Sequence, residues 1–355
     1  MDVYGLFGAR GLLPGVSERA IAALGLTEME ALEAIAEATT VESGLRAIGI
    51  LPGTGGAPYR NRLMYRPPAL SAPITTILPA GYQGDPAGAS TATDLLFLAP
   101  AIPRVSGFNL TKGRNVRLIG GRIDYNPGTG SRAIQWAGIS ESIFIEGVAV
   151  NLIRRPSDAF SAGGGAGLYP DVYLQNCWCN GLRGENATLH PDFFQLSYPI
   201  RNFYSHKTTF TTNYQGFFLA AQSAITGNLV IDESNAYCLD NTAADSGYAS
   251  AYWFSDSVDQ WNNTSHKIVC RKIYVAPGTD RTVRDRVTIY APGYPDGRGV
   301  LSSDEQGQFV WYPDLYPRLS DGRGNPAKFR EGTPPGGDYC RENDVGSGYG
   351  SPGYR

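Results

Sequence analysis

Between about Ala92 and Val275 the chain consists of short runs in which apolar and polar residues alternate, separated by Gly, Asn, Asp and Ser. Alternation with a period of two is typical of β-strands that bury one side. Four runs are similar to one another: NVRLIGGRID from Asn115, SIFIEGVAVN from Ser142, DVYLQNCWCN from Asp171 and YPIRNFYSH from Tyr198. The pattern predicts a mainly β fold built from a repeated unit.

A bend is expected at the same place in each of these runs. Two residues after an aliphatic position comes Gly120, Gly147, Asn176 or Asn202, with a period of about 27 residues. Gly and Asn tolerate a left-handed backbone better than other residues, so they suit a sharp turn between two strands. The residues that follow the bend are then expected to share an inner face: Val148, Val150, Cys177 and Cys179.

A second group of runs lies between the first ones, at uneven spacing. Its members are AIQWA from Ala133, DAFSA from Asp158, DFFQL from Asp192, GFFLA from Gly216 and AYWFS from Ala251. Strands that stay in register while their connecting loops vary in length are typical of a parallel β-helix. A β-sandwich is the alternative, but it does not require a recurring Gly or Asn. The two groups together favour the parallel β-helix.

The first 91 residues differ from this pattern. Within residues 1–50, Thr27 and Glu30 form a capping box ahead of apolar residues at helical spacing, which predicts a short helix. Residues 51–91 are rich in Pro and Gly and are interpreted as a linker and the entry to the β region. The helix is too small to bury a core by itself, so we expect it to anchor the chain to a partner.

The period is lost again near the C-terminus. We assign residues 92–275 to the β-helix and residues 276–330 to a β or irregular cap, because the last coil of a β-helix exposes an apolar cross-section. Residues 331–355 have low complexity, which predicts a tail that stays disordered unless neighbouring chains order it.

Composition and charge narrow the range of functions. The net charge of -3, the pI near 5.7 and the lack of a Lys/Arg cluster argue against nucleic-acid binding. No apolar stretch is long enough to insert into a membrane, and the N-terminus does not resemble a secretory signal, so we expect assembly in a cytoplasm. The five cysteines are irregularly spaced, which predicts that most are free thiols inside a core.

The segments NLTKGRNVRLIGGRID, SESIFIEGVAVN, DVYLQNCWCNG and HPDFFQLS resemble the pectin-lyase-like right-handed β-helices of virion-associated spikes and fibres, found in tailed phages and phage-like gene transfer agents. The resemblance extends over roughly residues 92–275. It implies a right-handed β-helix, a homotrimer, an N-terminal segment that attaches to other virion proteins, and a location in the virion after assembly in a bacterial cytoplasm. It also implies that the β-helix binds or cleaves a host surface polysaccharide, such as capsule or lipopolysaccharide.

Enzymes of this fold commonly use paired carboxylates, and one loop offers such a pair. In NGLRGENATLHPD, Asp192 and Glu185 are the candidate catalytic acids, assisted by His190 and Arg183. The competing interpretation is structural: Pro191 shapes a turn, Asp192 caps it, and His190 bonds to neighbouring backbone. No segment matches a catalytic signature residue by residue, so catalysis is the secondary expectation.

Aromatic residues interleaved with Asn, Gln, Ser and Asp suit carbohydrate, because sugar rings stack on aromatic faces while their hydroxyls bond polar groups. The aromatic set is Trp136, Tyr169, Tyr173, Trp178, Tyr204, Tyr214, Tyr248, Tyr252, Trp253 and Trp261. Alternation sends some of these rings inward. The residues chosen as carbohydrate-binding candidates are Trp136, Tyr169, Arg183, Tyr214, Trp253 and Trp261.

The three histidines are far apart in sequence and form no metal-binding motif, so neither a metal nor another cofactor is expected. The glycines of AGGGAG, from Ala162, are interpreted as a connection because no Lys-Ser or Lys-Thr follows them. The sequence therefore predicts a spike or fibre protein that binds host polysaccharide. Two alternatives remain open: a polysaccharide lyase or glycoside hydrolase on the same scaffold, and a particle assembly component without affinity for glycans.

Overall fold

The computed structural model describes residues 62–78, 81, 83–99, 102–125, 132–152, 157–165, 167–184, 190–219, 225–240, 250–254, 267–279, 286–288, 308–311 and 329–355. The helix expected within residues 1–50 lies outside these ranges, as do Glu185 and Trp261. The chain divides into two compact units, residues 1–66 with 351–355, and residues 67–350. In the described part of the first unit, Leu63 and Tyr354 form a parallel bridge.

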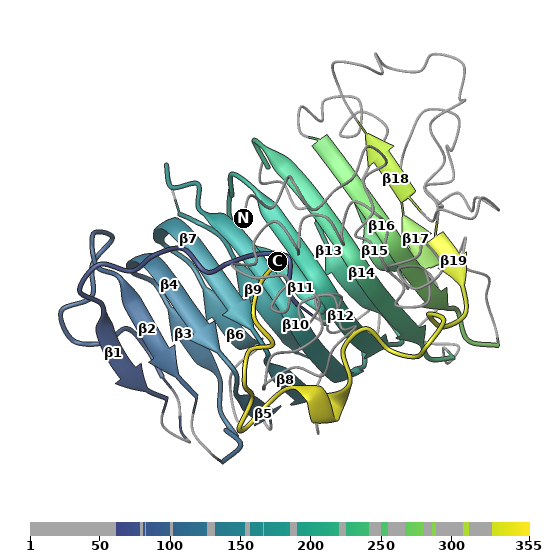
Figure 1. Ribbon diagram of the computed structural model, residues 1–355, viewed down its shortest axis with the longest axis horizontal. Coiled ribbons are helices and arrows are strands. Elements are labelled where there is room, and N and C mark those ends of the chain that lie inside the picture. The colour runs from purple at the N-terminus through teal and green to yellow at the C-terminus, as the bar shows by residue number, and fades with distance from the viewer. Residues whose placement is uncertain are drawn as a thin grey trace, which may run out of the picture. The chain divides into compact units, whose positions relative to one another are not determined.

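The second unit contains two β-sheets, one of 12 described strands and one of 7 (Figure 1). Parallel strands of the larger one, here called the long sheet, run in the order β1 (Ile74–Ile77), β2 (Leu95–Leu98), β4 (Gly113–Ile119), β7 (Ile139–Glu146), β10 (Asp171–Leu182), β12 (Phe203–Thr212), β14 (Asn228–Cys238) and β16 (Lys267–Ala276). Also in this sheet are β5 (Arg122–Tyr125), β8 (Ala149–Leu152), β18 (Gln308–Trp311) and β19 (Phe329–Glu331).

The smaller one, the short sheet, is parallel throughout its described strands. Its order is β3 (Phe108–Leu110), β6 (Arg132–Trp136), β9 (Asp158–Ala162), β11 (Phe194–Leu196), β13 (Gln215–Phe218), β15 (Ser250–Trp253) and β17 (Val287–Thr288). Five of these strands contain the second group of runs seen in the sequence. Between named strands, the antiparallel ladder in the described part is β16 with β18. Strand β18 lies within the expected cap, whereas all of β16 except its last residue lies within residues 92–275. Two parallel sheets fed by alternating strands are consistent with a parallel β-helix.

The recurring bend is confirmed for its first three members. Gly120, Gly147 and Asn176 have φ of +74°, +70° and +50°, in the left-handed region. The fourth assignment, Asn202, was wrong, because Gln175 pairs with His206 and Cys177 with Thr208, which places Lys207 opposite Asn176. Lys207 has φ of +53°. The run YPIRNFYSH therefore begins in the connection before β12, and its bend comes five residues later than its Asn suggests.

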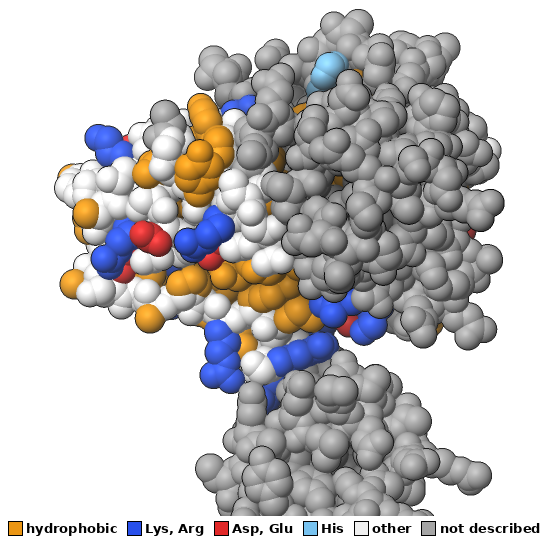
Figure 2. Space-filling view, turned by 90° about the horizontal axis from the view of Figure 1, so that it is seen from above, with side chains coloured by type: hydrophobic (Ala, Val, Ile, Leu, Met, Phe, Trp, Pro, Cys, Tyr) orange, Lys and Arg blue, Asp and Glu red, His pale blue; other side chains and the backbone are white. Residues whose placement is uncertain are grey.

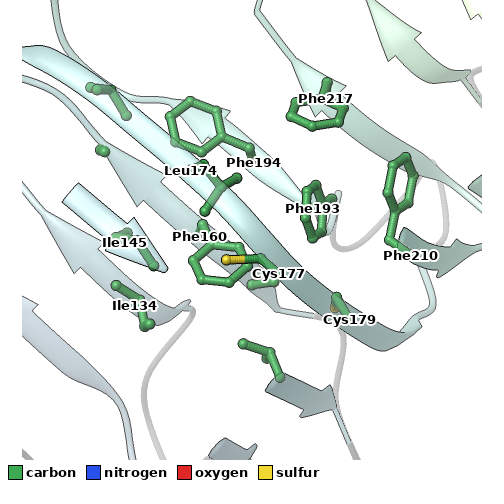
Figure 3. Close-up of a cluster of buried hydrophobic side chains, with 14 of the residues drawn as sticks. Ile134, Ile145, Phe160, Leu174, Cys177, Cys179, Phe193, Phe194, Phe210 and Phe217 are labelled. Atoms are coloured by element: carbon green, nitrogen blue, oxygen red, sulfur yellow. The ribbon is translucent and has the colours of Figure 1, made fainter. Parts of the chain in front are cut away.

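The core lies between the two sheets and is rich in phenylalanine (Figure 3). Leu174, Cys177 and Cys179 of β10 point into it from the long sheet, and Phe160 and Phe194 from the short sheet. All five cysteines are buried free thiols, as the sequence indicated. Burial raises the pKa of the Cys177 thiol well above its usual value, so this thiol stays protonated and acts as a small apolar side chain.

Strand pairing begins earlier than the sequence indicated. Strand β1 lies within residues 51–91, which were interpreted as a linker, and it pairs in parallel with β2 from Ile74 and Leu95 onward. The short run ITTI has too few residues for its alternation to stand out beside a Pro- and Gly-rich stretch. The long sheet therefore starts before Ala92.

The C-terminal segment, residues 332–350, is not the disordered tail that its low complexity predicted. It runs from β19 back across the long sheet toward β5 and β8 (Figure 1). The amide of Cys340 donates to Thr209 Oγ1 at 3.1 Å, and the amide of Gly346 donates to the Gly147 carbonyl at 2.8 Å. Low complexity failed as a guide because the bonds that hold this segment come from its backbone and from a few side chains.

One glycine of the bend also makes room for this segment. A Cβ atom added to Gly147 would lie 2.2 Å from the ring of Tyr349, closer than atoms can approach. The same position has a left-handed backbone. Gly147 is therefore required twice, once for the bend and once for the seat of Tyr349.

Candidate functional site

Two carboxyl groups form an acid pair at one end of adjacent strands in the short sheet: Asp158 is the first residue of β9, and Asp192 comes two residues before β11. Arg132 of β6 pairs in register with Asp158 of β9, and Phe160 pairs with Phe194 two residues further on. That register places Asp192 opposite Asp158. The amide of Asp192 also donates to Asp158 Oδ1 at 3.1 Å.

The two acids have different surroundings. Arg132 Nε donates to Asp158 Oδ2 at 2.9 Å, and Arg132 Nη2 donates to Gln195 Oε1 at 2.8 Å. Asp192 is 1% exposed, and both of its carboxyl oxygens are buried without a hydrogen-bond partner. One acid of the pair is therefore held by an ion pair, and the other is enclosed without one.

Burial controls the protonation of both groups. It raises the pKa of Asp158 to about 6, against the opposing effect of Arg132. Burial, together with the negative charge of Asp158, raises the pKa of Asp192 well above its usual value. The Asp192 carboxyl therefore holds its proton more tightly than an exposed aspartate does, beside a carboxyl group that is paired with an arginine. Such an arrangement can supply an acid and a base to one reaction.

Of the residues predicted to assist, His190 lies near this pair. Its charge lowers the pKa of Asp158, and its ring stacks on Tyr214 with centroids 5.1 Å apart. Arg183 is exposed and follows β10. Sequence reasoning found Asp192 but missed Asp158 and Arg132. A signal was present, since DAFSA and DFFQL both begin with Asp and were already aligned.

A second candidate site, formed by aromatic side chains, lies on the outer face of the long sheet. Tyr173 of β10 and Tyr204 of β12 pair in register, and their rings stack with centroids 5.1 Å apart and an angle of 18°. Both side chains are partly exposed. Phe144 of β7 continues the series, 6.0 Å from Tyr173. We call Tyr173 and Tyr204 the tyrosine pair.

Polar groups lie beside the tyrosine pair: Asp171 comes two residues before Tyr173, and Arg201 and Asn202 come directly before β12. Arg201 binds Asp171 through two hydrogen bonds, at 2.9 and 2.8 Å. Asn202 Nδ2 donates to Asp171 Oδ1 at 2.6 Å. On the face drawn in Figure 2, basic side chains likewise lie beside acidic ones, next to apolar patches. The tyrosine pair is thus bordered by a carboxylate, a guanidinium and an amide.

Most of the predicted carbohydrate-binding aromatic rings lie elsewhere. Trp136, Tyr214 and Trp253 are 0%, 1% and 8% exposed, so they have almost no face to offer a sugar. Trp136 packs in the core, 5.5 Å from Phe108. Tyr169, by contrast, is 44% exposed. The interpretation of these rings failed because the alternation in a strand shows that half of its side chains point inward, but not which half.

Within the described ranges, no group of three or more His, Cys, Asp or Glu side chains is placed to hold a metal ion. No helix in the same ranges is long and apolar enough to cross a membrane.

No protein-family model, curated protein or solved structure matches this chain.

Proposed function

We propose that this chain is a right-handed parallel β-helix of a spike or fibre protein, and that it attaches a phage-like particle to a host surface polysaccharide. The observation that carries the proposal is the tyrosine pair on the outer face of the long sheet, beside Asp171, Arg201 and Asn202. The long parallel sheets support it further, because they repeat the same outer position from coil to coil.

The chemistry of this face suits sugars. The C–H faces of a sugar ring pack on aromatic rings, and its hydroxyl groups bond to carboxylates and amides. The two stacked tyrosines cover one face of each other, so a sugar meets the outer face of Tyr204 and the edges and hydroxyl groups of both rings. The spacing of these groups is set by the sheet, at about 4.8 Å between strands. An extended polysaccharide that crosses the strands meets an equivalent row of groups at each step.

The rest of the proposal follows the resemblance of the sequence. The chain associates as a homotrimer, attaches to other virion proteins through its N-terminal segment, and resides in the virion after assembly in the bacterial cytoplasm. Neither a cofactor nor a nucleic acid is part of this function.

Replacing Tyr204 with alanine is expected to weaken polysaccharide binding by a factor of about 5–30, because an aromatic contact residue contributes about 1–2 kcal/mol. The measurement is calorimetric titration against a panel of purified capsular and lipopolysaccharide O-antigen polysaccharides. Phe218→Ala is the matched control, since Phe218 is a partly exposed ring on the short sheet, paired with Trp253. If the two variants lose the same affinity for polysaccharide, binding is not specific to the tyrosine pair, either because the short sheet binds the glycan or because both variants are partly unfolded.

The acid pair favours a second candidate function, a polysaccharide depolymerase. As a glycoside hydrolase, the chain would use Asp192 as the acid that donates a proton to the leaving oxygen and Asp158 as the base or nucleophile. Because Asp192 is 1% exposed, this function requires an opening that brings the acid pair to the substrate. Incubation with each polysaccharide of the panel, followed by measurement of chain length, separates the two functions. The binding function predicts unchanged chain length. Shortening of the polysaccharide by the unaltered chain, but not by Asp192→Asn, would establish the depolymerase. If the chain neither binds nor shortens any polysaccharide of the panel, the remaining function is that of a particle assembly component.

A further inference from the structure

A row of polar side chains continues the outer face of the long sheet beyond the tyrosine pair. Glu146, Gln175, His206 and Asp232 occupy the same register position on β7, β10, β12 and β14. Gln175 and His206 come two residues after Tyr173 and Tyr204, so they lie on the same face. All four are nearly inaccessible to solvent. We call them the polar row.

The C-terminal segment covers this row with polar contacts of its own. Tyr349 Oη donates to Glu146 Oε1 at 2.9 Å and accepts from Asn176 Nδ2 at 3.1 Å. Asp338 Oδ1 accepts from Asn235 Nδ2 at 2.9 Å, on β14. The amide of Tyr339 donates to Asn235 Oδ1 at 3.2 Å, which places this residue at the β14 end of the row. Burial, with the nearby charge of Glu233, raises the pKa of Tyr339.

An apolar cluster holds the segment at the other side of the bend. Cys340 and Val345 pack with Ala149, against Trp178 and Tyr349. Arg122 Nη1 donates to Glu342 Oε1 at 2.6 Å, and both side chains are partly exposed. The segment is therefore attached along its length by single hydrogen bonds, an ion pair and a small apolar cluster.

Apolar side chains at the four positions of the polar row would stabilise the fold at least as well as the polar ones do. Burying carboxylates, an amide and an imidazole on the outside of a sheet requires desolvation that well-packed apolar residues avoid. The segment does not satisfy the row fully, because Asp232 Oδ1 is buried without a hydrogen-bond partner. His206 is paired within the sheet, 3.4 Å from Glu233 Oε2, and Glu233 also accepts from Lys272 Nζ at 2.9 Å.

The hydrogen bonds of the Tyr349 phenol indicate that a sugar hydroxyl also fits the polar row. A hydroxyl that donates to a carboxylate and accepts from an amide makes the pair of bonds that sugar hydroxyls make in binding sites. The phenol of Tyr349 makes that pair with Glu146 and Asn176. The ring of Tyr349 lies over Gly147, as an aromatic or sugar ring can lie on a residue without a side chain.

We propose that the polysaccharide site continues along the polar row beneath the C-terminal segment, and that residues 332–350 compete with the glycan for it. This inference rests on the proposed binding function. With the segment in place, the glycan reaches the tyrosine pair. With the segment displaced, it reaches the tyrosine pair and the polar row together. Because binding and displacement are linked, the glycan must loosen the segment as much as the segment weakens the glycan.

The test compares Tyr349→Ala with the unaltered full-length chain. The variant loses the ring and both phenol bonds, so the segment is displaced more often and the panel polysaccharide binds on the order of tenfold more tightly. Tyr349→Phe keeps the ring and is expected to show a smaller gain. Asn343→Ala, at an exposed position of the same segment, is the matched control and should bind as the unaltered chain does.

Amide hydrogen exchange of the segment provides the second measurement. Saturating polysaccharide is expected to accelerate exchange at Cys340 and Gly346 in the unaltered chain, since their amides bond to Thr209 and Gly147. Equal affinity of the unaltered chain and Tyr349→Ala, with faster exchange in the variant, overturns the inference and leaves the binding function standing. If neither protein binds any polysaccharide of the panel, both proposals fail. If Tyr349→Ala unfolds, the same decision rests on Tyr349→Phe and on exchange in the unaltered chain.

Discussion

Replacing Phe193 with alanine is expected to lower the free energy of unfolding by about 3–5 kcal/mol. Phe193 is fully buried directly before β11, and its ring stacks on Phe210 with centroids 4.7 Å apart and an angle of 11°. It also meets Phe160 and Phe217 edge to face, at 5.4 and 5.1 Å. Phe193 thus contacts rings from three strands, β9, β12 and β13, and its loss leaves a cavity between the two sheets (Figure 3).

Denaturant unfolding followed by circular dichroism measures this effect. Phe218→Ala is the matched control, because Phe218 is only partly buried and faces away from the cluster around Phe193. We expect a loss of about 1 kcal/mol or less for the control. Similar losses in the two variants would show that the ring cluster between the sheets does not dominate the stability of the fold.

Replacing Arg132 with methionine is expected to destabilise the fold by about 3 kcal/mol at pH 8, and by about 1 kcal/mol or less at pH 4. Methionine keeps much of the length of the side chain but removes the guanidinium that bonds to Asp158 and Gln195. Above neutral pH the variant must then bury the Asp158 carboxylate next to Asp192 without a counter-ion.

The pH dependence follows from the raised pKa values of the acid pair. Asp158 has a pKa of about 6 in the folded chain, and that of Asp192 is also raised, whereas both are near 4 in an unfolded chain. The folded state therefore binds protons more tightly, so the stability due to these groups is complete below about pH 4 and is lost as the pH rises through 6. Removing Arg132 raises the pKa of Asp158 further, which enlarges the loss at high pH.

Thermal unfolding between pH 4 and 8 tests this prediction. Arg201→Met is the matched control, because Arg201 also binds an aspartate through two bonds, but at an exposed position. Exposed ion pairs contribute about 0–1 kcal/mol, so the control should change little at any pH. A loss of stability in Arg132→Met that is the same at pH 4 and pH 8 would contradict the protonation assigned to the acid pair.

The bend between strands was predictable from sequence only where the residue at the bend itself prefers a left-handed backbone. Gly120, Gly147 and Asn176 mark the bend because these residues favour the left-handed backbone that the bend needs. Lys207 and Glu233 adopt the same conformation without any preference for it, so the later coils gave no signal. In those coils the pairing of neighbouring strands imposes the bend on residues that resist it.

The sites were predictable only in part, for a related reason. Asp192 stood out in a polar loop, but its partner Asp158 lies 34 residues away and meets it through strand register, which a sequence does not display directly. The tyrosine pair was present in the aromatic set, yet nothing local separated Tyr204, which points outward, from Trp136, which points inward. A shift of one residue in register exchanges the two faces.

The central claim is that polysaccharide binds on the outer face of the long sheet, at the tyrosine pair. Hydroxyl-radical footprinting of the full-length chain, with and without a panel polysaccharide, tests it most directly because it reports the exposure of individual side chains. The account predicts reduced oxidation of Tyr173 and Tyr204 in the presence of polysaccharide, and unchanged oxidation of the exposed Tyr198. Unchanged oxidation of Tyr173 and Tyr204, with protection at His190 beside the acid pair, would contradict it.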